Sequence, residues 1–225
     1  MRLIVDLNLD NKHVVVLGGG TEGVRKVRGL LGQNCKITVI SNHLSQYLMA
    51  LEKQGQINTV KTQIKDAGIL ENYKNVFLLL ASTNNKTLNR ELVERGRAMG
   101  SFVYASDDPR YSDFSYTSII NIEGIIQIAI STFGKSPIMA RRIRIKLERL
   151  LNKAIKKEDI QNAKLQEFAR SAAKEKLETV VKRKEFLYSL IRDKHIQNLI
   201  KEDRFQEAKS ATLVLLENQE NKINK

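Results

Sequence analysis

A run of apolar residues that ends in three glycines constrains this chain more than any other feature. The stretch is HVVVLGGGTEGVRKVRGLL, residues 13–31, in which the apolar residues 14–17 lead directly into glycines 18–20. A continuous apolar run is typical of a strand that is covered on both faces of a parallel sheet. Residues 21–31 then have the pattern of a helix. The stretch therefore predicts a strand, a sharp turn and a helix in succession.

The glycines of this turn have the spacing G-x-G-x-x-G, met by Gly18, Gly20 and Gly23. The first glycine permits a tight turn, the second lets the backbone approach a pyrophosphate, and the third lets the helix pack close to the strand. The N-terminus of the helix favours the anion. A turn that serves packing alone is the alternative. We predict a dinucleotide site, to which the turn contributes Gly18, Gly19, Gly20, Thr21, Glu22 and Gly23.

The acidic residue that usually binds the NAD ribose about 20 residues further on is missing. The second expected strand, 36–40, is followed instead by Ser41, Asn42 and His43. Ser41 or Asn42 can hydrogen-bond a ribose hydroxyl, and His43 can meet a 2′-phosphate or be a bystander on the surface. These residues leave both NAD and NADP open.

Further strands alternate with helices up to about residue 110, which predicts an α/β fold with a Rossmann-type parallel sheet. The expected strands are 57–60, 76–81 and 101–105. Thr83 and Asn84 follow the strand 76–81, and we expect them to face the same crevice as the glycine turn. Ser41 is expected to cap a helix over 43–53, and Asn84 or Asn85 a helix that ends before Gly100.

The pattern changes after residue 112. Two β-rich runs, 114–121 and 125–131, predict an antiparallel hairpin, and Pro137 opens a helix. No proline or glycine occurs between Pro137 and residue 218, so the rest is expected to be helical, with breaks near 151–158 and 192–203. The predicted domains are a Rossmann NAD-binding domain over 1–112, a hairpin and helix over 113–150, and a helical domain over 151–225.

Composition narrows the class of protein. The chain has 225 residues, 42% of them hydrophobic, which suffices for a substantial core. Its apolar runs are too short to span a bilayer, its one cysteine excludes an internal disulfide, and its three histidines are scattered, which argues against a structural zinc site. We expect a cytoplasmic protein without a membrane anchor.

The chain carries a net charge of +13, which favours polyanionic ligands such as nucleic acid, acidic lipid or polycarboxylates. Residues 135–150 hold six basic side chains against Glu148 alone, a net of +5. The sequence Gly134-Lys135-Ser136 lacks the spacing of a P-loop, because Ala129 stands where the loop needs its first glycine. A nucleoside triphosphatase is therefore excluded.

Three stretches together resemble the dehydrogenase module of the siroheme synthase family. They are VVVLGGGTEGVRKV at 14–27, YASDDPRYSDF at 104–114 and IQIAISTFGKSPIMARRIRIKLE at 126–148. Their order and spacing agree with the family over about residues 1–150. Two positions depart from the family pattern, since Ser112 replaces a frequent cysteine and Phe133 replaces the first of two frequent glycines. Phe133 is expected to narrow the substrate site or alter its loop.

The resemblance implies precorrin-2 dehydrogenase activity, in which NAD⁺ oxidises precorrin-2 to sirohydrochlorin in tetrapyrrole biosynthesis. Some members of the family also insert ferrous iron to give siroheme, which leaves iron open as a further substrate. The family also implies a homodimer, formed through the hairpin and helix expected over 113–150.

The family's catalytic aspartate falls on Asp107, at the carboxyl end of an expected strand, where open α/β sheets place their ligands. A carboxylate there can take up a substrate proton as hydride leaves. Asp108 is expected to be an ordinary turn residue ahead of Pro109.

The resemblance also suggests which residues bind a polycarboxylate tetrapyrrole, because arginine forks match carboxylates and hydroxyls add contacts. The candidates are Ser131, Thr132, Lys135, Ser136, Arg141, Arg142 and Arg144. The alternative for each arginine is a solvated helix face. Arg25 and Lys26 match an Arg-Lys pair of the family and are expected to contact cofactor, contact a neighbouring subunit, or solvate their helix.

A non-catalytic protein is the competing hypothesis. In it, the Rossmann domain senses NAD(H) and the basic helical region binds nucleic acid or a protein partner. The basic residues of 151–225 are interleaved with acidic ones and accompanied by few aromatics, which argues against a nucleic-acid groove.

Overall fold

The fold is that of a computed structural model, which describes residues 3–223, with side chains through residue 219. The chain divides into two compact units, the first ending at Tyr116 and the second beginning at Thr117. The α/β fold class predicted from the sequence is confirmed. The finer division of the chain at residues 112 and 150 stays a prediction.

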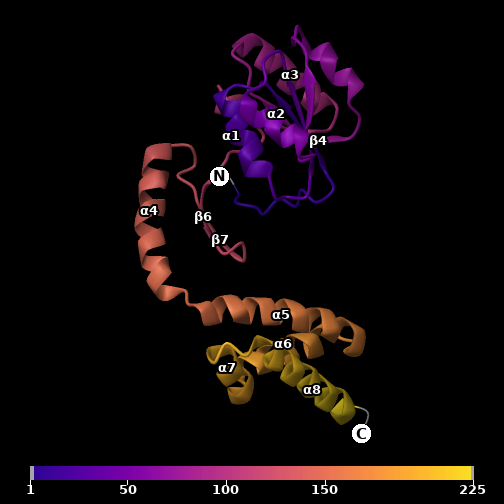
Figure 1. Cartoon of the computed structure of the whole chain (residues 1–225), viewed down its shortest axis with the longest axis vertical. Helices are drawn as coiled ribbons and strands as arrows, with labels where there is room; N and C mark the ends of the chain where they lie inside the picture. Colours follow the sequence, from indigo (N-terminus) through magenta and orange to yellow (C-terminus); the bar gives the residue numbers. More distant parts are fainter. Residues whose placement is uncertain (1–2, 224–225) are drawn as a thin grey trace. The chain divides into compact units, whose positions relative to one another are not determined.

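The N-terminal unit contains a five-stranded, fully parallel sheet in the order β3-β2-β1-β4-β5. Figure 1 draws this unit in colours from indigo to magenta. Its strands are β1 (His13–Leu17), β2 (Lys36–Ser41), β3 (Asn58–Lys61), β4 (Val76–Ala81) and β5 (Phe102–Ala105). Its helices are α1 (Thr21–Leu30), α2 (Gln46–Lys53) and α3 (Lys86–Ala98), with the 3₁₀ turns η1 (Ala67–Asn72) and η2 (Pro109–Tyr111).

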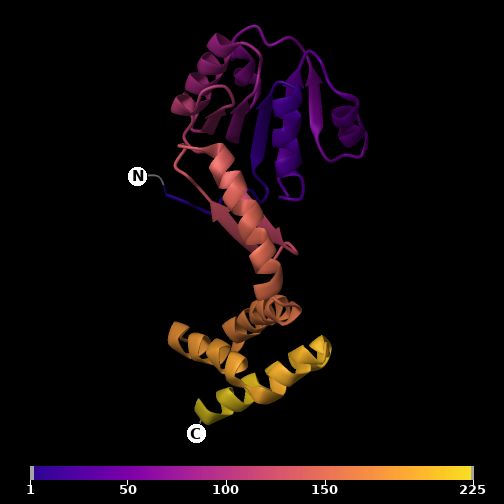
Figure 2. The same cartoon turned by 90° about the vertical axis from the view of Figure 1, so that its left-hand side faces the viewer.

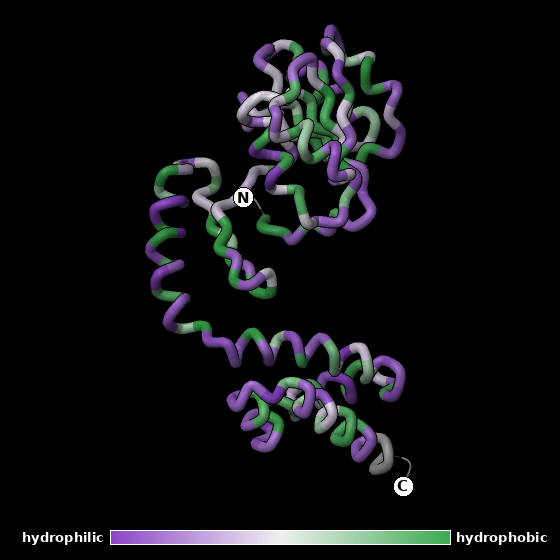
Figure 3. Tube along the Cα trace, in the orientation of Figure 1, coloured by the Kyte–Doolittle hydropathy of each residue, from purple (hydrophilic) through white to green (hydrophobic). Residues whose placement is uncertain are grey.

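The apolar run that opens the unit is buried on both faces of this sheet. Val14 and Val16 pack with residues of α1 and α2, such as Leu30 and Leu48. Val15 and Leu17 point to the other face and pack against α3 and η1. Figure 2 shows helices on both sides of the sheet, and Figure 3 shows its strands as an apolar interior. Two-sided burial explains why these strands are apolar throughout instead of alternating.

The C-terminal unit begins with a β-hairpin and continues as five helices. The hairpin pairs β6 (Ser118–Ile122) with β7 (Ile126–Ile130), as the sequence predicts. The helices are α4 (Pro137–Ala154), α5 (Lys157–Lys176), α6 (Val180–Arg192), α7 (Lys194–Lys201) and α8 (Phe205–Ile223). Helices α5 to α8 share one apolar core that includes Leu165, Phe186 and Leu190.

Three local predictions need correction. Ser41 is the last residue of β2, and Ser45 is the residue that caps α2, by accepting a hydrogen bond from the N–H of Leu48. The predicted break at 192–203 contains the short helix α7. A further break before Val180 was not predicted, and there Thr179 caps α6.

The loop between β7 and α4 contains Phe133, one of the two positions that depart from the family pattern. Phe133 and Gly134 both have positive φ, at 54° and 81°. Glycine adopts this left-handed conformation without the steric cost that a Cβ imposes, which explains why a pair of glycines suits the turn. Phe133 adopts this left-handed conformation despite its Cβ, and its side chain is exposed.

Among the described residues, none of the helices is both long enough and apolar enough to cross a bilayer.

Two glycines of α1 test the packing of the glycine turn. A Cβ on Gly23 would overlap the carbonyl oxygen of Gly18, whereas a Cβ on Gly29 meets no atom within 4 Å. We expect Gly23→Ala to lower the free energy of unfolding by about 2 kcal/mol. Gly29→Ala should raise it by about 0.5–1 kcal/mol, because alanine is the better helix former.

The measurement is urea unfolding followed by tyrosine fluorescence, since five of the six tyrosines lie in the N-terminal unit. Equal stability of the Gly23→Ala protein and the wild type would contradict the close approach of the helix to the turn.

Candidate functional site

The three glycines of the G-x-G-x-x-G turn have three different environments. Gly18 has φ +110°, and a Cβ there would collide with the carbonyl group of Ser82. Gly23 packs against Gly18, so the third glycine brings α1 against the strand. Gly20 is the N-cap of α1 and has open space where a Cβ would stand. The turn therefore leaves a backbone surface open in front of a helix N-terminus, as a pyrophosphate requires.

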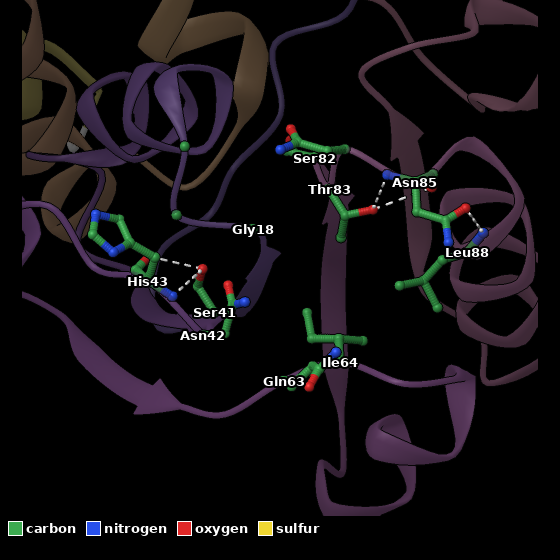
Figure 4. A pocket seen from close by; sticks show the side chains of 13 residues that line it. Gly18, Ser41, Asn42, His43, Gln63, Ile64, Ser82, Thr83, Asn85 and Leu88 are labelled. Carbon is green, nitrogen blue, oxygen red and sulfur yellow. Dashed lines mark hydrogen bonds between the residues drawn. The ribbon is translucent and has the colours of Figure 1, made fainter.

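A pocket of about 400 Å³ lies beside this turn, at the carboxyl ends of the central strands (Figure 4). Seven of the ten predicted cofactor residues line it: Gly18, Gly19, Gly20, Ser41, Asn42, Thr83 and Asn84. The other three stand on α1, where Thr21 and Glu22 are exposed and Gly23 is buried. The strand order changes direction at β1, between β2 and β4, and this is where open α/β sheets bind ligands.

One end of the pocket is formed by Ser41, the last residue of β2, and by Asn42 and His43, which follow it. The hydroxyl of Ser41 donates to the carbonyl oxygen of His43 at 2.8 Å, and the N–H of His43 lies 3.3 Å from the same hydroxyl. Figure 4 shows this pair turned toward each other. Ser41 thus shapes the turn, while the exposed Asn42 and His43 offer free polar groups to a ligand. The pocket lining contains no carboxylate side chain.

The loop after β4 is held by α3. Asn85 caps the helix by accepting from the N–H of Leu88 at 3.2 Å. The side-chain oxygen of Asn89 accepts two hydrogen bonds from Thr83, from its hydroxyl at 2.6 Å and from its N–H at 3.1 Å. Thr83 is therefore fixed in both backbone and side chain.

Asp107 follows β5 and is exposed. Its Oδ1 accepts a hydrogen bond of 2.7 Å from the side-chain amide of Asn89, the residue that also binds Thr83. The hydroxyls of Ser82 and Ser106 lie 2.6 Å apart and link the ends of β4 and β5. Asp107 thus presents a carboxylate at the same sheet edge as the pocket.

The neighbouring Asp108 has the turn role that the sequence predicts. It accepts from the N–H of Arg110 and begins η2. Hydrogen bonds from Arg110 lower the pKa of Asp108 to about 2, so this carboxylate stays charged.

Arg25 and Lys26, adjacent in sequence, differ completely in environment. Arg25 is exposed and pairs with Glu22 at 2.7 Å. Lys26 is 3% exposed, and its Nζ lies 3.8 Å from the ring centroid of Tyr104 and 3.7 Å from that of Tyr116. A solvated helix face is therefore wrong for Lys26, which is clamped between two rings.

The predicted substrate residues lie in the second unit, in the loop after β7 and on α4. Thr132 and Ser136 bond to each other, and Ser136 caps α4 by accepting from the N–H of Met139. The hydroxyl of Ser131 accepts from the N–H of Phe133. Lys135, Arg141 and Arg142 are exposed, whereas Arg144 pairs with Glu148 at 2.8 Å. The loop hydroxyls thus have structural partners, and the cations of Lys135, Arg141 and Arg142 face solvent.

Several residues at the pocket escaped the sequence analysis: Gln63, Ile64, Ser82, Asn85, Leu88 and Asn89. Gln63 and Ile64 follow β3, just as Asn42 and His43 follow β2, so the rule on carboxyl strand ends offered a signal for them. Asn89 lies inside a helix and carried no such signal. Among residues 3–219, no cluster of three or more His, Cys, Asp or Glu side chains is placed to hold a metal ion.

Comparisons with known proteins match the N-terminal unit and the first part of the C-terminal unit. A family model described as "Putative NAD(P)-binding" matches residues 5–118, and one described as "Sirohaem biosynthesis protein central" matches residues 124–150. The siroheme synthase of Neisseria meningitidis serogroup C is 33% identical over 80% of this chain and 35% of its own length. Siroheme synthase 1 of Aeromonas salmonicida is 36% identical over 64% of this chain and 30% of its own.

A solved structure, "SirC, precorrin-2 dehydrogenase", superposes with a TM-score of 0.66 at 22% identity, over 93% of this chain and all of the other. That likeness concerns the fold. The chain spans about a third of the length of the curated siroheme synthases that it matches.

The burial of Lys26 between two aromatic rings should make the free energy of unfolding depend on pH. Burial lowers the pKa of Lys26 to about 7, with Arg25 acting in the same direction and Glu22 against it. The unfolded chain keeps the proton to a much higher pH. Between about pH 7 and pH 8.5 the unfolded state therefore binds more protons, and the free energy of unfolding should rise with pH by up to about 1.4 kcal/mol per unit.

The test compares wild type with Lys26→Met in urea unfolding at several pH values, because the difference isolates this amine. A difference that stays constant with pH would contradict the assignment, and it would mean that the two ring faces hold the ammonium group charged.

Proposed function

We propose that this chain, which belongs to the siroheme synthase family, is an NAD-dependent dehydrogenase that oxidises precorrin-2 to sirohydrochlorin. The observation that carries the proposal is the position of Asp107 at the sheet edge that also holds the dinucleotide pocket. Family membership supplies the identity of the substrate, and the pocket supplies a place for the oxidant.

The pocket fits NAD⁺ on the evidence of its backbone. Open space at Gly20 and the N-terminus of α1 suit the pyrophosphate, and Asn42 suits a ribose hydroxyl. When bound, NAD⁺ supplies the acceptor for a hydride ion. Ser82 and Thr83 line the wall of the pocket on the β4 side.

The residue that we assign to proton transfer is Asp107. Removing two hydrogens from precorrin-2 releases a hydride ion, which NAD⁺ accepts, and a proton, which needs a base. A carboxylate that is exposed at the sheet edge can take this proton and pass it to water.

The basic residues of the second unit suit the carboxylate groups of a tetrapyrrole. Arg141, Arg142 and Lys135 carry exposed cations, and an arginine fork binds a carboxylate through two parallel hydrogen bonds. We assign substrate contacts to these three residues and to Arg144, with the loop hydroxyls of Ser131, Thr132 and Ser136 as further contacts.

The hairpin β6–β7 and the helix α4 offer support for a homodimer. The hairpin β6–β7 has just two strands and packs against α4, and these elements bury few apolar residues of their own. Exposed apolar side chains lie on it and on α4, such as Ile119 at 47%, Ile138 at 79% and Leu150 at 63% exposure. A second copy of the chain would cover such a surface.

The test is anaerobic incubation of the purified protein with enzymatically generated precorrin-2 and NAD⁺, followed by visible absorption. We expect NAD⁺-dependent formation of sirohydrochlorin. Asp107→Ala should lower the rate about 10²–10⁴-fold, the usual contribution of a general base. The assay is run first without ferrous iron and then with it, and siroheme formation in the second would add metal insertion to the activity.

Asp108→Asn is the matched control, because it removes one charge from the same turn while asparagine can still accept from the N–H of Arg110. Its rate should equal that of the wild type. Turnover that survives in Asp107→Ala would overturn the role of Asp107. No turnover by a folded wild type that binds NAD⁺ would favour a non-catalytic NAD(H) sensor.

A further inference from the structure

Asn89 is the most completely bonded side chain at the sheet edge. It lies on α3 and is 1% exposed. Its Oδ1 accepts the hydroxyl and the N–H of Thr83, and its Nδ2 donates to the carbonyl oxygen of Thr83 at 3.1 Å and to Asp107 at 2.7 Å. An asparagine amide has two donor hydrogens and two acceptor lone pairs, and all four are used here.

These four bonds join two parts of the site that come from different strands. Thr83 belongs to the loop after β4 and lines the pocket, and Asp107 belongs to the loop after β5. The rigid helix α3 carries the amide between them. Because the amide is buried, its bonds form in a setting where an unmade hydrogen bond is costly, so its orientation is tightly held.

We propose that Asn89 is a positioning residue that fixes the carboxylate of Asp107 relative to the cofactor loop, so that base and oxidant are assembled as one unit. The inference rests on the proposed function, in which Asp107 takes the substrate proton. Asn89 itself stays beneath the site, because its four hydrogen-bonding positions are taken within the protein.

The variant Asn89→Asp keeps the shape of the side chain. It replaces the NH2 donor of the amide with a carboxyl oxygen. One carboxylate oxygen can still accept from the N–H and the hydroxyl of Thr83. The other oxygen faces two acceptors, Thr83 O and the carboxylate of Asp107, so both donated hydrogen bonds of the amide are lost. Two carboxyl groups this close repel each other or share one proton, and either outcome disables Asp107 as a base. The variant should therefore disturb Asp107 while it leaves part of the loop's support in place.

Steady-state kinetics with precorrin-2 and NAD⁺ read this effect. We expect Asn89→Asp to lower kcat about 10- to 100-fold at saturating substrates, since a displaced catalytic group loses rate on this scale. In an Asp107→Ala background the same change should lower kcat less than about twofold, because the group that Asn89 positions is gone. An equal fold loss in both backgrounds, or a loss confined to the KM for NAD⁺, would reduce Asn89 to a support of the Thr83 loop.

A spectroscopic measurement reads the contact without any turnover. In a ¹H–¹⁵N spectrum of the full chain, the side-chain amide of Asn89 is assigned by its absence in Asn89→Asp or, if that protein fails to fold, in Asn89→Gln. Asp107→Ala, a change at an exposed residue, should shift this resonance and speed its exchange with water. Asp108→Asn should leave it in place.

The two measurements separate the two proposals. If the Asn89 side-chain resonance keeps its chemical shift and exchange rate in Asp107→Ala, the positioning role is overturned, whatever the substrate. A resonance that responds, in a protein that does not oxidise precorrin-2, keeps the link between Asn89 and Asp107 and overturns the proposed function alone.

Discussion

Burial of β1 on both faces of the sheet is the constraint on which the rest of the N-terminal unit depends. Val14 and Val16 are enclosed on one side and Val15 and Leu17 on the other, so residues 14–17 accept only apolar side chains on both faces of the sheet. The chain must therefore leave the sheet only after Leu17, and it does so through Gly18 at φ +110°. The position of the pocket follows from where this strand ends.

Most polar groups of the site lie at or just after the ends of strands, and α3 holds two of these segments. The buried Asn89 connects the segment after β4 with the segment after β5. Such an arrangement places the exposed carboxylate of Asp107 on a support that solvent does not reach. Outside the pocket, the amine of Lys26 is likewise shielded from solvent, because the faces of Tyr104 and Tyr116 enclose it.

Local signals in the sequence predicted the sheet, the glycine turn, the hairpin and most of the residues that line the pocket, because each depends on neighbours in the chain. Gly18, Gly20 and Gly23 were identifiable by spacing alone, and Thr83 by its place after a strand. Asn89 was not, because its importance arises from Thr83 and Asp107 meeting in space. Lys26 was misjudged for the same reason, since the rings that bury it are about 80–90 residues away in sequence. Ser41 resembled a helix cap because it is the first polar residue after an apolar run. The strand β2 in fact continues through Ser41.

The segment between the two apolar cores has little core of its own. In β6, β7 and α4 the buried apolar residues are Ile120 and Ala140, among the residues that the structure describes. The Rossmann sheet and the bundle of α5 to α8 can each acquire order within a single chain. In the proposed dimer the middle segment would acquire its order from a second chain. The middle segment would then fold in a bimolecular step, whose rate depends on protein concentration. The parts that precede and follow it in sequence would fold in unimolecular steps, whose rates do not.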